Sequence, residues 1–188
     1  MKFSQREIKE LLISTLALAV MFSRFNIDVF PITLFVVVLV FASHEILGHK
    51  LFAQHYGFDA EYRMWSSGII LGLLMALMGG FVFAAPGAVM ISPISKKFAF
   101  TVGKMTKQQY GLIAASGAMV NIVIGLTMIG ALYYYPLEIL ALTARVSFFL
   151  ALFNMIPFGP LDGEKVMKWS WKVWGLITGI ALIGYFIL

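Results

Sequence analysis

The chain has 188 residues, of which 61% are hydrophobic and only 12% are charged, and its formal net charge is +5. Soluble domains contain about 45–50% apolar and about 25% charged residues, so this composition is that of a membrane protein. The basic residues form no patch interleaved with aromatic side chains, which argues against nucleic acid as a partner. Since the chain has no cysteine, thiolate metal sites are excluded, and any metal must be bound by imidazole or carboxylate.

Several apolar segments are long enough to cross a bilayer, which takes about 20 mostly apolar residues. The first resembles a signal sequence because basic residues precede it, but no small-x-small cleavage site follows, so we expect it to be retained. We predict an all-α, multi-pass membrane protein with about five or six transmembrane helices. The expected spans are residues 8–25, 30–54, 109–134, 137–157 and 169–188.

A further apolar stretch, at about 66–91, differs from an ordinary span. Gly79 and Gly80 interrupt it, a β-prone Phe-Val-Phe follows, and Ala85-Pro86-Gly87 is a poor continuation for a helix. The stretch either crosses the membrane as an additional helix or re-enters it. In the second case it forms a short helix, turns at the glycine pair, and returns as a strand, Phe81 to Ile91, to the side that it left.

The basic residues favour the re-entrant alternative, because short cytoplasmic loops carry an excess of lysine and arginine. If 66–91 crosses the membrane, the basic residues divide between the two sides. If it re-enters, all 14 lysines and arginines lie on one side except Arg24, on the other, and Arg145, within the bilayer. We therefore expect the N-terminus and the re-entrant segment to face the cytoplasm. Irregular backbone at membrane depth requires a polar cavity, and an exposed strand edge there could bind an extended peptide.

The span 30–54 contains His44, Glu45 and His49, and ionisable residues inside a membrane mark functional sites. Zinc takes about three protein ligands, and a nearby glutamate can act as a general base. Residues five apart on an α-helix point about 140° away from each other, however. A π-bulge, or unwound backbone near Gly48, would bring the histidines together. The alternative is a buried polar cluster satisfied by neighbouring helices.

A third ligand is expected from Asp162, in the segment FNMIPFGPLDGEKV at 153–166. Prolines and glycines break the helix there, at the cytoplasmic end of its span, and the span with the histidines ends on the same side. Glu164 is a weaker candidate because it lies farther toward water. His55 lies about 16 Å along the helix axis from His44, which is too far for a shared metal ion.

These motifs resemble the site-2 protease family of intramembrane zinc metalloproteases, of the archaeal and bacterial type, and we expect no PDZ or CBS accessory domain. HEILGH at 44–49 and NMIPFGPLDG at 154–163 carry the resemblance, which covers roughly residues 30–165. GAMVN at 117–121 is similar to the family's Gly-Pro-x-x-Asn, with alanine in place of proline. The first motif of the family is HExxH, whereas this chain has one additional residue between the histidines.

The resemblance implies a role for each candidate residue. His44, His49 and Asp162 would bind zinc, and Glu45 would be the catalytic base that activates water. Asn121 and Asn154 would bind the substrate backbone or stabilise an oxyanion, although such amides also form hydrogen bonds between helices.

The implied function is hydrolysis of a peptide bond within a transmembrane segment of a membrane-protein substrate by zinc-activated water. The partners are then that segment and the lipid bilayer, and the sequence does not indicate the oligomeric state. We expect residues 1–188 to form a single transmembrane domain, with the catalytic core at about 30–165 and extra spans at 8–25 and 169–188.

Two alternatives to an active protease remain. One is a catalytically inactive member of the same fold that binds transmembrane helices. The other is a small ion or proton transporter in which His44, Glu45, Asp162 and Arg145 form the path.

Overall fold

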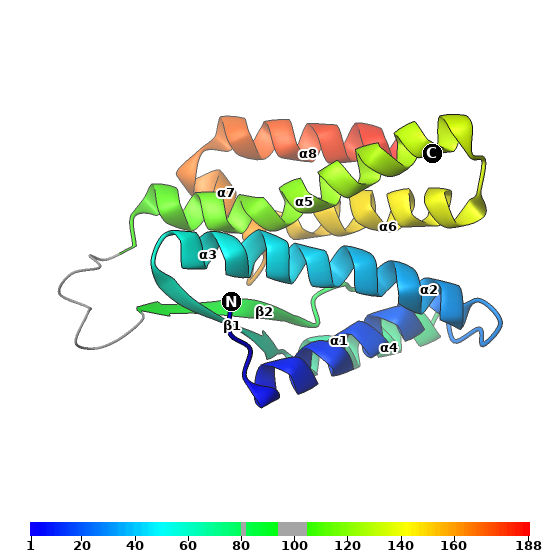
Figure 1. Cartoon of the computed structure of the whole chain (residues 1–188), viewed down its shortest axis with the longest axis horizontal. Helices are drawn as coiled ribbons and strands as arrows, with labels where there is room; N and C mark the ends of the chain where they lie inside the picture. The colour runs from blue at the N-terminus through cyan, green and yellow to red at the C-terminus, as the bar shows by residue number, and fades with distance from the viewer. Residues whose placement is uncertain (80–81, 94–104) are drawn as a thin grey trace.

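The computed structural model describes residues 1–79, 82–93 and 105–188, and most of them are helical (Figure 1). One helix, Phe30–His55, is continuous but changes its hydrogen-bonding pattern along its length, and we call it the long helix. In chain order the elements are α1 (Gln5–Ser23), α2 (Phe30–Val37), η1 (Val38–Ala42), η2 (His44–Lys50), α3 (Leu51–His55), β1 (Phe58–Met64), α4 (Ser66–Leu77), β2 (Gly87–Pro93), α5 (Lys107–Tyr134), α6 (Glu138–Asn154), α7 (Asp162–Trp169) and α8 (Trp171–Phe186).

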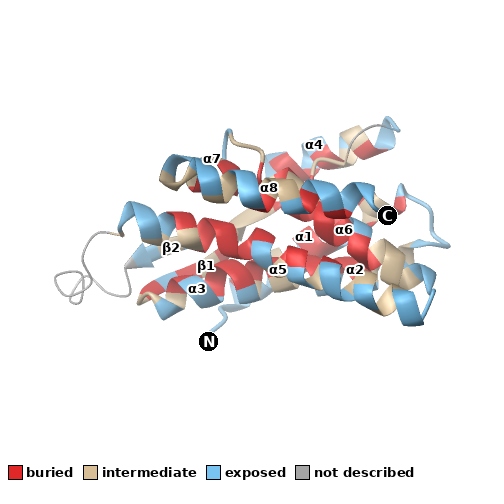
Figure 2. Ribbon diagram, turned by 90° about the horizontal axis from the view of Figure 1, so that it is seen from above, coloured by how far each residue is buried: buried red, intermediate tan, exposed pale blue. Residues whose placement is uncertain are grey.

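Two of the described helices, Phe30–His55 and Lys107–Tyr134, are long and apolar enough to cross a membrane. The other expected spans form shorter helices: α1 has 19 residues, α6 has 17 and α8 has 16. A total of five or six spans therefore stays a prediction. Many large apolar side chains on the outer faces of the helices are exposed, and the buried residues face inward (Figure 2). Such an outer surface is unfavourable in water and favourable in lipid.

Two clusters of buried apolar side chains hold the helices together. The first joins α1, the long helix and α6 around residues such as Leu18, Val37 and Leu150. The second joins α5, α6 and α8 around Phe148 and Ala181. Because α6 contributes to both clusters, it fixes the long helix relative to α5, and these two elements carry the histidines of the candidate site and the groups that contact their Nδ1 atoms.

The stretch 66–91 leaves a small sheet and returns to it. β1 and β2 pair antiparallel with Met64 opposite Gly87, and the Trp65 N–H donates to the Pro86 carbonyl oxygen at 2.7 Å. The 12 residues of α4 span about 18 Å, less than the roughly 30 Å of a hydrocarbon core. The two ends of the excursion therefore lie next to each other at the sheet, and the re-entrant topology stays a prediction.

The boundaries of this segment differ from the expected ones. The strand begins at Gly87, and residues 82–86 are irregular, so the expected strand from Phe81 to Ile91 is too long at its start. Gly80 and Phe81 lie outside the described residues. Gly79 ends α4 with φ +73°, a conformation that glycine adopts without a steric cost. The partner strand β1 is an element that the sequence analysis does not predict.

Candidate active site

The two histidines of the long helix lie on a π-helical segment. Residues His44–Lys50 form η2, in which each backbone hydrogen bond joins residues five apart. His49, five residues after His44, therefore lies one helical turn above it and on the same face of the helix. The Nε2 atoms of His44 and His49 lie 3.0 Å apart, and both side chains are buried. The long helix thus has the departure from α-helical geometry that the five-residue spacing requires.

Two glycines let the long helix approach α5 closely. A Cβ on Gly48 would lie 2.6 Å from the Gly117 Cα atom, so the two backbones are in contact there. A Cβ on Gly117 would lie 2.5 Å from the His49 Nε2 atom and 2.6 Å from that of His44. Glycine at 117 therefore provides the space that both imidazoles occupy.

The carboxylate of Asp162 reaches the same point from the broken segment after α6. Its Oδ2 atom lies 3.0 Å from the His49 Nε2 atom, and the ligand atoms of His44, His49 and Asp162 are all within 4.8 Å of one another. The segment folds tightly: a Cβ on Gly163 would lie 2.2 Å from the Met155 carbonyl oxygen. The structure thus brings together the three residues that the sequence proposes as metal ligands.

The other imidazole nitrogens are held by α5. The His49 Nδ1 atom lies 2.8 Å from the Ile113 carbonyl oxygen, which can only accept, so Nδ1 carries a proton, and Nε2 is the nitrogen that can bind a metal when the imidazole is neutral. The His44 Nδ1 atom lies 3.0 Å from the side-chain amide of Asn121. The Asn121 Oδ1 atom is buried without a hydrogen-bond partner among the described residues. A rotated amide would let Oδ1 accept from a His44 Nδ1 proton, which leaves both Nε2 atoms free to bind a metal.

The carboxylate of Glu45 is buried beside these ligands. Its Oε2 atom has no hydrogen-bond partner among the described residues, and an unpaired buried carboxylate oxygen is costly unless a ligand or water satisfies it. Glu45 borders a cavity of about 790 Å³, a size typical of ligand sites. The wall of this cavity also includes His49, Asp162, Lys165, Asn154 and the β2 residues 87–91.

Lys165 is a site residue that the sequence analysis misses. Its Nζ atom lies 2.9 Å from the Asp162 Oδ1 atom, so the two carboxylate oxygens have different partners, Lys165 and His49. Burial lowers the pKa of Lys165, but the adjacent Asp162 outweighs burial and raises it above its usual value. The signal was available in the sequence, since residues three apart on a helix lie on the same face.

The remaining candidates lie elsewhere. Asn154 borders the cavity and donates to the Leu150 carbonyl oxygen at 2.9 Å. Asn121 is fully buried and contacts His44, a candidate metal ligand. It does not border the cavity, where a substrate-binding or oxyanion residue is expected. Glu164 pairs with Lys168, and His55 is exposed next to Tyr56.

Arg145 does not belong to the wall of this cavity. It donates to the Leu188 carbonyl oxygen at 2.6 Å. This contact with Leu188 gives a partner to an arginine that the sequence analysis places within the bilayer.

Comparison with known proteins agrees with this geometry. A protein of Methanocaldococcus jannaschii that carries the name "Putative zinc metalloprotease MJ0611" is 40% identical over 191 residues, which cover 98% of this chain and 94% of that protein. No solved structure matches the chain. Residues 59–176 match peptidase family M50. The chain therefore belongs to peptidase family M50, the site-2 protease family.

Proposed function

We propose that this protein is a zinc metalloprotease that hydrolyses a peptide bond within a transmembrane segment of a membrane-protein substrate. The proposal rests above all on one observation: the ligand atoms of His44, His49 and Asp162 converge, and Glu45, whose Oε2 atom has no hydrogen-bond partner among the described residues, borders the same cavity as His49 and Asp162. Membership in a peptidase family supports the reaction class. In this proposal the chain crosses the membrane several times, and its N-terminus and active site face the cytoplasm.

The residues present suit zinc. Two imidazoles and one carboxylate are a typical ligand set for catalytic zinc, and Gly117 leaves both Nε2 atoms accessible to a shared ion. A zinc ion bound there would supply a Lewis acid that polarises the substrate carbonyl and makes water a stronger acid.

Glu45 would act as the general base and then as the general acid. Its free oxygen accepts a proton from the attacking water as the water oxygen bonds to the peptide carbonyl carbon. The same carboxyl group then gives the proton to the amide nitrogen, and the carbon–nitrogen bond breaks. The Glu45 Oε2 atom suits this cycle, because no hydrogen bond to a described residue must first be broken at that oxygen.

The outer edge of β2 would bind the substrate. A helical substrate hides its peptide groups in its own hydrogen bonds, so it must unwind before cleavage. Backbone groups of alternate residues in an antiparallel pair point to the same edge. Tyr62 and Met64 direct their N–H groups away from β2, so their cross-strand partners Val89 and Gly87 direct theirs toward the opposite edge. An extended peptide could pair there, beside the cavity.

The transporter alternative has less support. Arg145 contacts the end of the chain instead of the cavity, and the ionisable groups that converge have the composition of a metal site. A catalytically inactive member of the family would bind zinc without needing Glu45, so substitution of Glu45 separates that alternative from an active protease.

The test uses the purified protein in lipid vesicles together with single-span membrane proteins tagged at both ends. We expect about one zinc per chain by elemental analysis, and cleavage within the span of at least one probe. Glu45→Gln should retain zinc and lose cleavage, whereas His49→Ala should lose both. Absence of zinc from the wild-type protein, or unchanged cleavage by the Glu45→Gln variant, would refute the proposal.

A further inference from the structure

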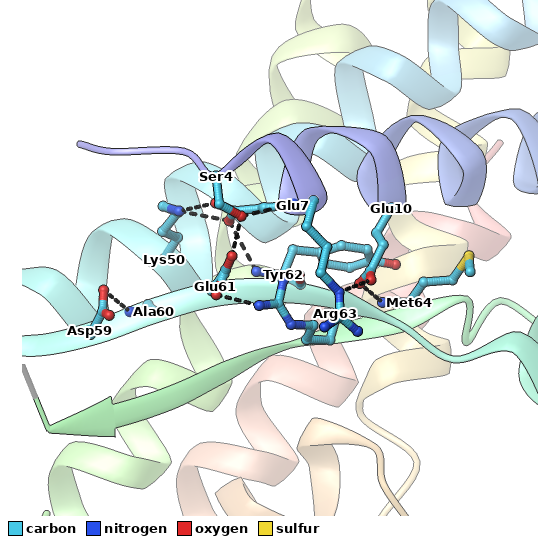
Figure 3. A network of polar contacts seen from close by, with 11 residues as sticks. Ser4, Glu7, Glu10, Lys50, Asp59, Ala60, Glu61, Tyr62, Arg63 and Met64 are labelled. Atoms are coloured by element: carbon cyan, nitrogen blue, oxygen red, sulfur yellow. Dashed lines mark hydrogen bonds and ion pairs between the residues drawn. The ribbon is translucent and has the colours of Figure 1, made fainter.

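The outer edge of β1 is occupied by two side chains of α1 (Figure 3). The Tyr62 N–H donates to the Glu7 Oε1 atom at 3.0 Å, and the Met64 N–H donates to the Glu10 Oε2 atom at 3.0 Å. Residues three apart on a helix are separated by about 5–6 Å, close to the roughly 6.6 Å between residues two apart on a strand. The two carboxylates therefore match the spacing of the N–H groups on this edge. We call Glu7 and Glu10 the carboxylate clamp.

The clamp is fixed from the side of the long helix. The Lys50 Nζ atom lies 2.6 Å from both carboxylate oxygens of Glu7, and both side chains are only 2% exposed. Lys50 is the last residue of η2 and follows His49 directly. Breaking a buried pair of this kind is strongly destabilising, so the ion pair ties α1 firmly to the helix that carries the two histidines.

Further contacts orient the first turn of α1 (Figure 3). The Ser4 hydroxyl accepts from the Glu7 N–H at 3.0 Å, which caps the helix, and it also contacts Glu61. Arg6 pairs with Glu10 at 2.6 Å. The clamp carboxylates are therefore held on both sides and have little freedom to leave the strand.

We propose that Glu7 and Glu10 are positioning residues that close one edge of the sheet, so that an extended substrate segment can pair only with β2. An open strand edge is a template for any extended chain, and β1 and β2 are the only strands in the described part of the sheet. The β2 edge borders the cavity with Glu45 and His49, whereas the β1 edge faces α1. Closing the β1 edge prevents the substrate segment from pairing with β1, where its peptide bonds would lie away from Glu45. This inference rests on the proposed binding of substrate to β2.

Amide hydrogen exchange tests the clamp without any need for activity or zinc. Glu10→Leu removes the acceptor from Met64, whereas the matched Glu10→Gln variant keeps an acceptor oxygen. We expect the Met64 amide to exchange roughly tenfold faster in the leucine variant and at nearly the wild-type rate in the glutamine variant. Wild-type protection in the leucine variant would overturn the clamp.

Glu7 requires a paired design, because its loss alone leaves Lys50 buried without a counter-charge and could unfold the protein. The double variants Glu7→Gln with Lys50→Met and Glu7→Leu with Lys50→Met both remove the ion pair, but only the first keeps an acceptor for Tyr62. Faster exchange of the Tyr62 amide in the second variant alone supports the inference. Equal exchange in the two variants would overturn it.

Disulfide trapping tests the choice of edge, and the absence of natural cysteines makes each introduced one unique. The probe is an extended peptide of alternating valine and threonine with one cysteine, and the variants are Met90→Cys on β2 and Asp59→Cys on β1, both at exposed positions. We expect trapping at position 90 and none at position 59. Equal trapping at both, or trapping at neither, would overturn the inference. If hydrogen exchange and trapping give the expected results but the wild-type protein cleaves no probe, the proposed function is refuted and the inference about the sheet edges stands.

Discussion

Gly117 offers the most direct test of the metal site, because Gly117→Ala places a methyl group where the two imidazoles meet. The added Cβ would lie 2.5 Å and 2.6 Å from the Nε2 atoms of His49 and His44, and real Cβ contacts are almost never shorter than 3.0 Å. The two nitrogens must therefore retreat by at least 0.5 Å and 0.4 Å. Metal–ligand distances vary by only about 0.2 Å, so the shift exceeds the tolerance of the site.

We expect Gly117→Ala to lower zinc affinity by about 10–100-fold, as do changes that disturb ligand orientation. That range corresponds to about 1.4–2.8 kcal/mol. The assay is competition for zinc with a chromophoric chelator, combined with thermal unfolding of the metal-free protein to verify folding.

Two further glycines of α5 provide controls. A Cβ on Gly130 meets nothing within 4 Å, so Gly130→Ala should leave zinc affinity unchanged. A Cβ on Gly125 would lie 2.7 Å from the Phe148 ring, so Gly125→Ala disturbs packing without touching the ligands. If Gly117→Ala binds zinc as tightly as Gly130→Ala does, the reasoning from ligand crowding fails.

Two other contacts predict effects on zinc affinity. Asn121→Leu should weaken zinc binding about 10–100-fold, because the His44 Nδ1 atom loses the side-chain amide that orients it, whereas Asn121→Asp keeps an acceptor oxygen and should bind zinc. Wild-type affinity in the leucine variant would contradict the orienting role. Lys165→Met should weaken binding roughly tenfold, because the Asp162 Oδ1 atom loses its partner, and Lys165→Arg should restore most of it. Equal affinities of the methionine and arginine variants would show that Lys165 does not hold Asp162.

The sequence predicts the site more completely than it predicts the fold around it. His44, Glu45, His49 and Asp162 are recognisable because charge is rare in an apolar chain, and helical geometry alone indicates that the histidine spacing needs a distortion. The sequence cannot tell whether a π-helix or an unwound segment provides that distortion. The choice depends on how closely the long helix can approach α5, a tertiary contact between Gly48 and Gly117.

The β1 strand shows where the sequence analysis falls short. Phe58, Ala60 and Tyr62 are buried and alternate with polar residues, which is the pattern of a strand with one buried face. The sequence analysis predicts no element between the span at 30–54 and the apolar stretch at about 66–91. The backbone N–H groups of Tyr62 and Met64 donate to side chains of α1, more than 50 residues earlier in the chain. No local sequence pattern predicts that pairing.

Adjacent residues at the end of η2 face opposite neighbours: His49 contacts α5 and the Asp162 carboxylate, and Lys50 contacts Glu7 on α1. In a regular α-helix one extra residue rotates everything after it by about 100°, and the π-helical turn of η2 absorbs that rotation. The π-helical turn therefore sets the direction of a metal ligand and of a buried cation at once. If this seven-residue turn were α-helical with the same sequence, both side chains would point elsewhere. The register of a single helical turn thus links zinc binding to the attachment of α1.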